Sequence, residues 1–165
     1  MRSEWDDLGI PNEDAYHPVE TADFGGRGRT DQQLYLRIPK RGTAFPAVVW
    51  FHGGGLTGGG REVPDALFDG RMAVIEARYR LSPEFPAPAA LADAVAATAW
   101  TLKRAEARGI DPERVFVGGM SAGAWLAAMT GMDRSYLAAY GIDSRKLAGL
   151  LLVSGQMTTH FQLKI

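Results

Sequence analysis

Cysteine is missing from this sequence of 165 residues, which excludes disulfides, thiolate metal sites and a cysteine nucleophile. No apolar run approaches the ~20 residues that a membrane-spanning helix needs. The first residues carry acids and no apolar stretch, so we expect no signal peptide and a cytoplasmic location. Histidine, aspartate and glutamate do not gather at metal-ligand spacing, and we expect neither a metal nor another cofactor.

Net charge is also small, since 18 basic residues nearly balance 19 acidic ones and the formal charge is −1. This balance gives no electrostatic reason to expect nucleic acid or an anionic membrane as a partner. The Gly/Arg cluster at 25–29 is interpreted as a flexible loop rather than an RNA-binding tract, because it is short and single. The length predicts one domain, with residues 1–30 as an irregular lead-in that has room for one short strand and residues 31–165 as the folded unit.

Apolar runs alternate with helical patterns along that unit. Strands are predicted at 33–38, 45–51, 72–77, 114–118 and 146–153, and helices at 65–68, from 88 to about 108, after 122 and at 134–140. Pro88 suits the first turn of the long alanine-rich helix, Gly109 suits its C-terminal cap, and residues 111–113 predict a turn. Strands that are apolar on both faces and alternate with helices indicate an α/β fold, a three-layer sandwich with a mostly parallel sheet.

The pentapeptide at 119–123, Gly-Met-Ser-Ala-Gly, lies between a predicted strand and a predicted helix. A serine at such a turn is a nucleophile elbow, with its hydroxyl above the C-terminal ends of the strands. Gly119 and Gly123 are expected because a Cβ would collide with the neighbouring elements. The helix that follows points its N-terminal N–H groups at the site, which suits a developing oxyanion. The alternative is a Gly/Ser turn that merely joins two elements.

A second glycine-rich segment favours the functional interpretation. His52 and the triple glycine at 53–55 directly follow the strand predicted at 45–51. This is an HGGG-type oxyanion loop, whose glycines let backbone N–H groups approach a substrate carbonyl. His52 is expected to hold that loop by a hydrogen bond. Two parts of one catalytic machine in the right order are consistent with a hydrolase.

In these segments and two others, the chain resembles the α/β-hydrolase superfamily, in its carboxylesterase/lipase branch related to hormone-sensitive lipase. The resemblance is carried by residues 52–55 (HGGG), 79–84 (YRLSPE), 119–123 (GMSAG) and 154–161 (SGQMTTHF). It implies that residues 31–165 form a partial domain of this fold. It also implies a serine esterase that acts on small ester substrates with short acyl groups.

The resemblance implies a role for each matching residue. Ser121 becomes the acyl nucleophile, and the N–H groups of Gly54, Gly55 and Ala122 become the oxyanion hole. His52, Gly53, Gly119 and Gly123 support the two motifs. Met120, beside the nucleophile, is a candidate for substrate contact, whereas Met129 and Met132 are expected in the helix core and Trp125 against the sheet.

The family pattern places an acid and a histidine after two further strands, and the sequence reads as truncated before both. A serine hydroxyl is a weak nucleophile without a base, so the expected activity is impaired unless a base is borrowed. His160 is the candidate for that role, while His17 is expected at the surface and His52 in the loop. The alternative function is a catalytically silent binding or oligomerising protein.

Two expectations concern contacts. Arg80 and Glu84 are expected to form a local ion pair or a hydrogen-bonded turn rather than a substrate clamp. Residues 147–153 are expected to form an apolar strand at an unpaired sheet edge, which invites a second chain. We therefore expect a homo-oligomer formed through this edge.

Overall fold

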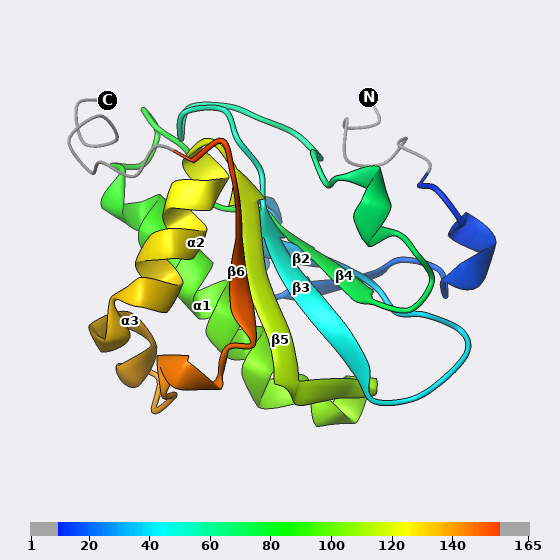
Figure 1. The fold of residues 1–165 in the computed structure, drawn as a ribbon. Helices are drawn as coiled ribbons and strands as arrows, with labels where there is room; N and C mark the ends of the chain where they lie inside the picture. Colours follow the sequence, from blue (N-terminus) through cyan, green and yellow to red (C-terminus); the bar gives the residue numbers. More distant parts are fainter. Residues whose placement is uncertain (1–9, 156–165) are drawn as a thin grey trace.

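Six strands form one sheet in the computed structural model, which describes residues 10–155 (Figure 1). They are β1 (Glu20–Asp23), β2 (Gln33–Arg37), β3 (Phe45–Phe51), β4 (Ala73–Ala77), β5 (Ile110–Met120) and β6 (Gly149–Val153), in the spatial order β1-β2-β4-β3-β5-β6. The four strands from β4 to β6 pair in parallel, whereas β1 and β2 are antiparallel. The predicted α/β fold with a mostly parallel sheet is confirmed.

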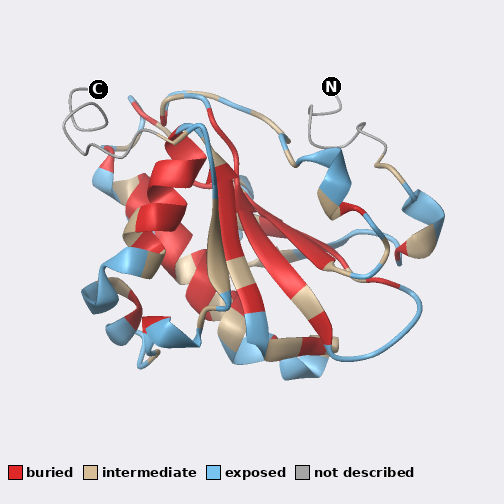
Figure 2. Ribbon diagram, viewed as in Figure 1, coloured by how far each residue is buried: buried red, intermediate tan, exposed pale blue. Residues whose placement is uncertain are grey.

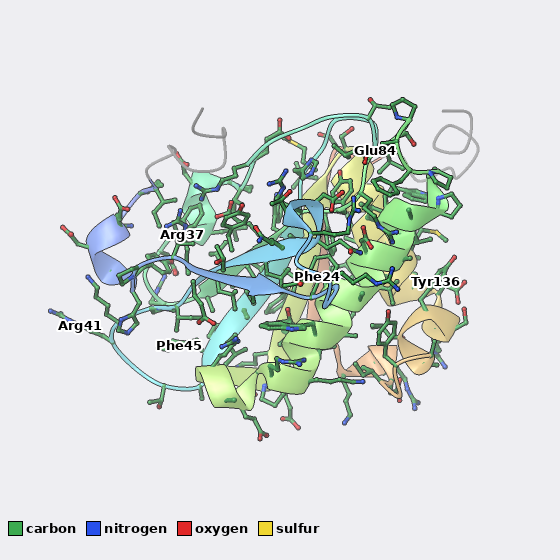
Figure 3. All side chains as sticks on the ribbon, turned by 180° about the vertical axis from the view of Figure 1, so that it is seen from behind. Phe24, Arg37, Arg41, Phe45, Glu84 and Tyr136 are labelled. Carbon is green, nitrogen blue, oxygen red and sulfur yellow. The ribbon has the colours of Figure 1, made fainter. Side chains whose placement is uncertain are left out.

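The α-helices within residues 10–155 lie on one side of this sheet (Figure 1). They are α1 (Pro88–Arg104), α2 (Ala122–Met132) and α3 (Arg134–Ala138). The other side is covered by η1 (Glu13–Ala15) and η3 (Asp65–Leu67), and three further 3-10 turns are η2 (Thr30–Gln32), η4 (Glu106–Arg108) and η5 (Ser144–Lys146). Seen from behind, the turn after β1 brings Phe24 against α1 (Figure 3).

Two hydrophobic clusters occupy the two faces of the sheet. The larger one joins β3, β4 and β5 to α1 and α2, and the smaller one packs Tyr16 and Phe68 on Trp50 and Val74. All five residues of β4 are buried, and Figure 2 shows the central strands almost entirely in the buried colour. Strands covered on both faces are apolar at most positions, which explains why their sequence runs do not alternate.

Strand β5 is longer than the sequence predicts, because it starts at Ile110 and includes the predicted turn at 111–113. Ile110 pairs with Phe45, and the register then shifts before Ala47 pairs with Val115. The predicted turn is therefore an irregularity inside the strand. Gly109, with a φ of 70°, caps η4 and not α1, which already ends at Arg104.

Strand β6 begins at Gly149, three residues later than predicted, because residues 144–146 form η5. It pairs with β5 alone among the described residues, and the side chains of Leu152 and Val153 are 37% and 40% exposed. Its predicted burial is wrong for this reason, while its predicted place at the sheet edge agrees with the order of the strands.

Two further predictions differ from the structure. Met132, expected in the core, is 72% exposed because α2 ends at this residue. Arg80 forms no ion pair with Glu84 among the described residues and pairs with Asp93 of α1 at 2.7 Å. Glu84 does lie in a hydrogen-bonded turn, the other predicted form, which the Phe85 N–H closes on the Leu81 carbonyl oxygen at 3.0 Å. Trp125 and Met129 do pack on the larger cluster, as predicted. Within residues 10–155, no helix is long and apolar enough to cross a bilayer.

Candidate active site

Ser121 occupies a sharp turn between the end of β5 and the first residue of α2. Its φ of 53° and ψ of −115° are unusual for a residue with a side chain, and this conformation is strained. Its N–H donates a hydrogen bond to the Val153 carbonyl oxygen at 2.9 Å, and its own carbonyl oxygen accepts one from the Trp125 N–H at 3.2 Å. The turn is thus held by β6 on one side and by α2 on the other, with Ser121 exposed at its apex.

The glycines that flank this turn have no room for a side chain. A Cβ on Gly123 would lie 2.5 Å from the His52 carbonyl oxygen and closer still to that of Phe51. A Cβ on Gly119 would lie 2.6 Å from the same Phe51 oxygen. Both positions therefore require glycine because the elbow is pressed against the end of β3.

The triple-glycine loop starts where β3 ends and lies beside the serine. A Cβ built on Gly53 would be 3.4 Å from the Ser121 Cβ, so the two segments are neighbours in space. Gly54 and Gly55 have φ values of 105° and 64°, which favour glycine. Among residues 10–155, the N–H groups of Gly54, Gly55 and Ala122 have no hydrogen-bond partner. The structure thus brings together the residues that the sequence assigns to the oxyanion hole.

The buried side chain of His52 holds the start of this loop in place. Its side chain is 4% exposed, and its Nδ1 lies 2.6 Å from the Gly53 carbonyl oxygen. Since a carbonyl oxygen only accepts, Nδ1 carries the proton. The ring stacks on Tyr79 with 4.2 Å between centroids, and the Tyr79 hydroxyl donates to the His52 carbonyl oxygen at 2.7 Å. Burial lowers the pKa of His52 and keeps the ring neutral, while the hydrogen bond to Gly53 opposes that shift.

Glu62 is a residue of this site that sequence reasoning missed. Its carboxylate accepts a hydrogen bond from the Gly53 N–H at 3.3 Å, and its carbonyl oxygen accepts one from the Trp50 indole at 2.7 Å. The loop therefore folds back on its own first glycine. The sequence shows only that an acid follows the glycines of the loop. Its neighbours in the sequence do not distinguish this acid from one exposed to solvent.

The remaining candidates lie elsewhere. His17 is exposed, as expected, and His160 lies outside the described residues. Met120 is partly buried and packs on the smaller hydrophobic cluster. No group of His, Asp or Glu residues within 10–155 could hold a metal ion.

Comparison with known proteins places this geometry in a family. A sequence model described as alpha/beta hydrolase fold matches residues 48–162, which include both glycine-rich segments. The carboxylic ester hydrolase LipN of Mycobacterium tuberculosis is 45% identical over 97 residues, which are 55% of this chain and 26% of that protein. The carboxylesterase NlhH of the same organism is 38% identical over 119 residues, which are 67% of this chain and 37% of that protein.

Solved structures agree with these relatives. The hyperthermophilic esterase from the archaeon Pyrobaculum calidifontis has a TM-score of 0.66 and 30% identity, covering 85% of this chain and 44% of that one. A bacterial heroin esterase has the same TM-score and identity, covering 83% of this chain and 43% of that one. This chain therefore spans less than half the length of the proteins that it resembles.

Proposed function

This chain belongs to the alpha/beta hydrolase fold family, in its hormone-sensitive-lipase-like branch of esterases and lipases, and on that premise we propose that it is a serine carboxylesterase-type hydrolase. It acts on short acyl esters through an acyl-enzyme at Ser121. One observation carries the proposal: the strained turn at Ser121 and the triple-glycine loop lie side by side. Three backbone N–H groups that have no partner within the described part of the chain flank the serine, which is the arrangement that a developing oxyanion needs.

The proposed reaction follows from these groups. The Ser121 Oγ attacks the ester carbonyl carbon while its proton passes to a base, and the carbonyl oxygen becomes an oxyanion. The N–H groups of Gly54, Gly55 and Ala122 donate to this oxygen. Collapse breaks the bond to the alcohol, which leaves with a proton, and the acyl group remains on Oγ. Water then attacks the acyl-enzyme, releases the carboxylic acid and restores the hydroxyl.

Attack by the Ser121 hydroxyl requires a base that takes its proton. His52 is buried under the loop, where its ring stacks on Tyr79 and its Nδ1 donates to the Gly53 carbonyl oxygen, so we assign it to loop support. His160, which lies beyond the described residues, is the remaining candidate for a base within this chain. The His160→Ala variant should lose acyl-enzyme formation if this assignment holds, and unchanged kinetics would reject it.

Covalent labelling with a fluorophosphonate probe tests the nucleophile directly. We expect the wild-type chain to be labelled on Ser121, with the site identified by peptide mass spectrometry, and Ser121→Ala to lose the label. Ser135→Ala is the matched control, because this exposed serine lies on α3 outside the site. Absence of labelling in a folded wild-type chain would reject the esterase and favour the silent binding protein.

Acyl specificity needs a separate measurement. We expect hydrolysis of p-nitrophenyl acetate and butyrate to exceed that of the palmitate ester, and Ser121→Ala to remove the difference from the uncatalysed rate. A preference for palmitate would contradict the assignment to short acyl groups while leaving the nucleophile intact.

A second proposal, independent of the first, concerns the oligomeric state and the part of the hydrolase domain in this chain. We propose that β6 pairs with β6 of another copy, since β6 has one strand partner among the described residues and carries exposed Leu152 and Val153. We also propose that residues 31–165 are the part of the hydrolase domain that this sequence contains. The lead-in of 1–30 adds β1 to its sheet.

A further inference from the structure

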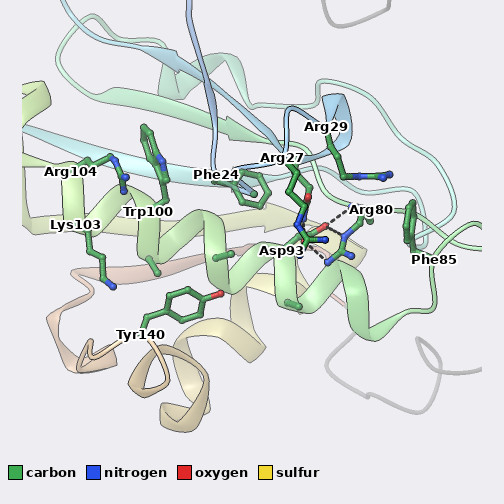
Figure 4. Close-up of a pocket in the computed structure, with 15 residues that line it drawn as sticks. Phe24, Arg27, Arg29, Arg80, Phe85, Asp93, Trp100, Lys103, Arg104 and Tyr140 are labelled. Atoms are coloured by element: carbon green, nitrogen blue, oxygen red, sulfur yellow. Dashed lines mark hydrogen bonds and ion pairs between the residues drawn. The ribbon is translucent and has the colours of Figure 1, made fainter.

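A groove runs along α1 (Figure 4), and neither Ser121 nor the triple glycine at 53–55 lines it. It encloses about 580 Å³, within the range of small-molecule sites. Its floor is made of Ala92, Ala96 and Ala99, whose spacing places them on one side of the helix. Phe24 and Trp100 form part of its walls, and Tyr140 closes one side from the segment after α3.

The groove is strongly cationic although the whole chain carries a formal charge of −1. Its lining includes one acid, Asp93, and five basic residues: Arg27, Arg29, Arg80, Lys103 and Arg104. Asp93 is already occupied, because it binds Arg80 through two hydrogen bonds of 2.8 and 2.7 Å. Arg29 is likewise paired with Asp31 at 2.7 Å.

Three of these cations have no acidic partner among residues 10–155: Arg27, Lys103 and Arg104. All three side chains are exposed, so their charges are available to a ligand. Like charges on one concave surface repel one another, and an anion would relieve that repulsion. The lining therefore selects for negative charge in its ligand.

Aromatic rings hold two of the free cations in place. The Arg104 guanidinium lies 4.8 Å from the centroid of the Trp100 ring, and the Lys103 Nζ lies 5.7 Å from that of Tyr140. Stacking a guanidinium on a ring leaves its N–H edge free to bind a carboxylate or phosphate. The Tyr140 ring and the alanine floor offer apolar contact to the rest of a ligand, whereas the Trp100 ring carries a second guanidinium, that of Arg108, 4.8 Å from its centroid.

We propose that this groove binds an amphiphilic anion, with a carboxylate or phosphate head on Lys103 and Arg104 and an apolar tail along Ala99, Ala96 and Ala92. The direction of the ligand tail is set by the alanine floor, because this floor extends along α1 from Trp100 toward the first residues of the helix (Figure 4). Arg27 adds a further positive charge beside the path of the tail. This site is separate from ester hydrolysis at Ser121, so either proposal can hold without the other.

Calorimetric titration with decanoate below its micelle concentration tests the site. We expect saturable binding that weakens with added salt, because the cations are exposed. Decanol and inorganic phosphate, which offer the tail and the head separately, should each bind at least about tenfold more weakly. Absence of decanoate binding at low salt, or equal binding of decanol, would overturn the proposal.

Two variants separate the head from the tail. Lys103→Gln with Arg104→Gln should weaken decanoate binding about tenfold or more by removing both charges. Ala96→Leu should weaken it by filling the floor, and leucine keeps the helix favourable. The matched control, Lys40→Gln with Arg41→Gln, removes two exposed cations outside the groove and should bind as wild type. Unchanged affinity in the first two variants would reject this location.

A parallel experiment distinguishes a free anionic ligand from a lipid in a membrane as the source of the head group. Vesicles of phosphatidylglycerol, compared with phosphatidylcholine, present the same anionic chemistry on a lipid surface. Binding to the anionic vesicles that disappears in the Lys103/Arg104 variant, without binding of free decanoate, would assign the site to lipid head groups and overturn the free-ligand form of the proposal. Vesicle binding that persists in the variant would place that interaction outside the groove.

Discussion

At the scale of single residues, the candidate site depends on places where a methyl group does not fit. The elbow glycines touch the backbone of β3, and the loop glycines adopt positive φ values. Gly59 belongs to the same set, because a Cβ there would overlap the Gly53 carbonyl oxygen and the His52 ring. The sequence predicts glycine at the elbow from its motif, but Gly59 acquires its role only from contacts made across the loop.

Substitution of Gly123 by alanine tests this crowding. The new methyl group would overlap the Phe51 and His52 carbonyl oxygens, so the end of β3 must move. We expect the free energy of unfolding to fall by about 1–3 kcal/mol, measured by urea denaturation, and fluorophosphonate labelling to slow. Gly58→Ala is the control, since nothing lies within 4 Å of its Cβ position. Equal stability of the two variants would contradict the steric argument.

His52 predicts a pH dependence of stability. Burial lowers its pKa in the folded state, so below the unfolded value of about 6.5 the unfolded chain binds more protons than the folded one. The free energy of unfolding should therefore fall as the pH drops from 7 to 5, by up to about 1.4 kcal/mol per pH unit from this group. Stability is retained above that window, where both states are neutral.

Chemical denaturation of His52→Gln at several pH values measures this contribution. The variant should show a shallower fall in unfolding free energy between pH 7 and 5 than the wild type. His17→Gln, which changes an exposed histidine, is the matched control and should keep the wild-type slope. A His52→Gln slope as steep as that of the wild type would remove His52 as the cause.

At the scale of elements, β4 shows what a strand pattern hides. The sequence predicts β4 as a buried apolar strand, and it is buried, yet its fourth residue is Glu76, which is 2% exposed. Arg61 binds this carboxylate through two nitrogens, with 2.6 Å from Nη2 to Oε1, and Arg37 of β2 approaches Oε1 at 3.5 Å. Arg61 belongs to the segment that follows the oxyanion loop, so the ion cluster ties that segment to the sheet.

Removing the charge of Glu76 should therefore be costly. Glu76→Gln leaves two buried guanidinium groups without their anion, and we expect the free energy of unfolding to fall by about 3–5 kcal/mol in urea denaturation. Glu113→Gln makes the same chemical change at an exposed position and should alter stability by less than about 0.5 kcal/mol. Comparable losses in both variants would show that burial of the cluster is not the cause.

At the scale of the whole molecule, the sheet has two unlike edges. Within residues 10–155, the antiparallel strand β1 forms one edge with polar residues, while β6 forms the other with exposed leucine and valine. Apolar edges with unpaired backbone groups recruit other strands, whereas charges on an edge prevent this. The proposed association through β6 follows from this asymmetry.

Light scattering of the eluted chain tests the association. The wild type should elute as a dimer or larger species, and Leu152→Lys should shift it toward the monomer because the charge blocks edge pairing. Thr21→Lys places the same charge on β1 and should leave the mass unchanged. A wild type that stays monomeric at high concentration would refute the proposal.

The sequence alone predicts the order of strands and helices along the chain, the mostly parallel sheet and the turns at the two glycine-rich segments. It does so because periodicity and the steric demands on glycine are local properties. Tertiary structure decided what those patterns cannot encode. Folding alone brings Arg80 to Asp93, Glu76 to Arg61 and Glu62 to Gly53. Folding also decides that Met132 and Leu152 stay exposed. Such pairings depend on which surfaces the elements turn toward each other, and no run of neighbouring residues specifies that choice.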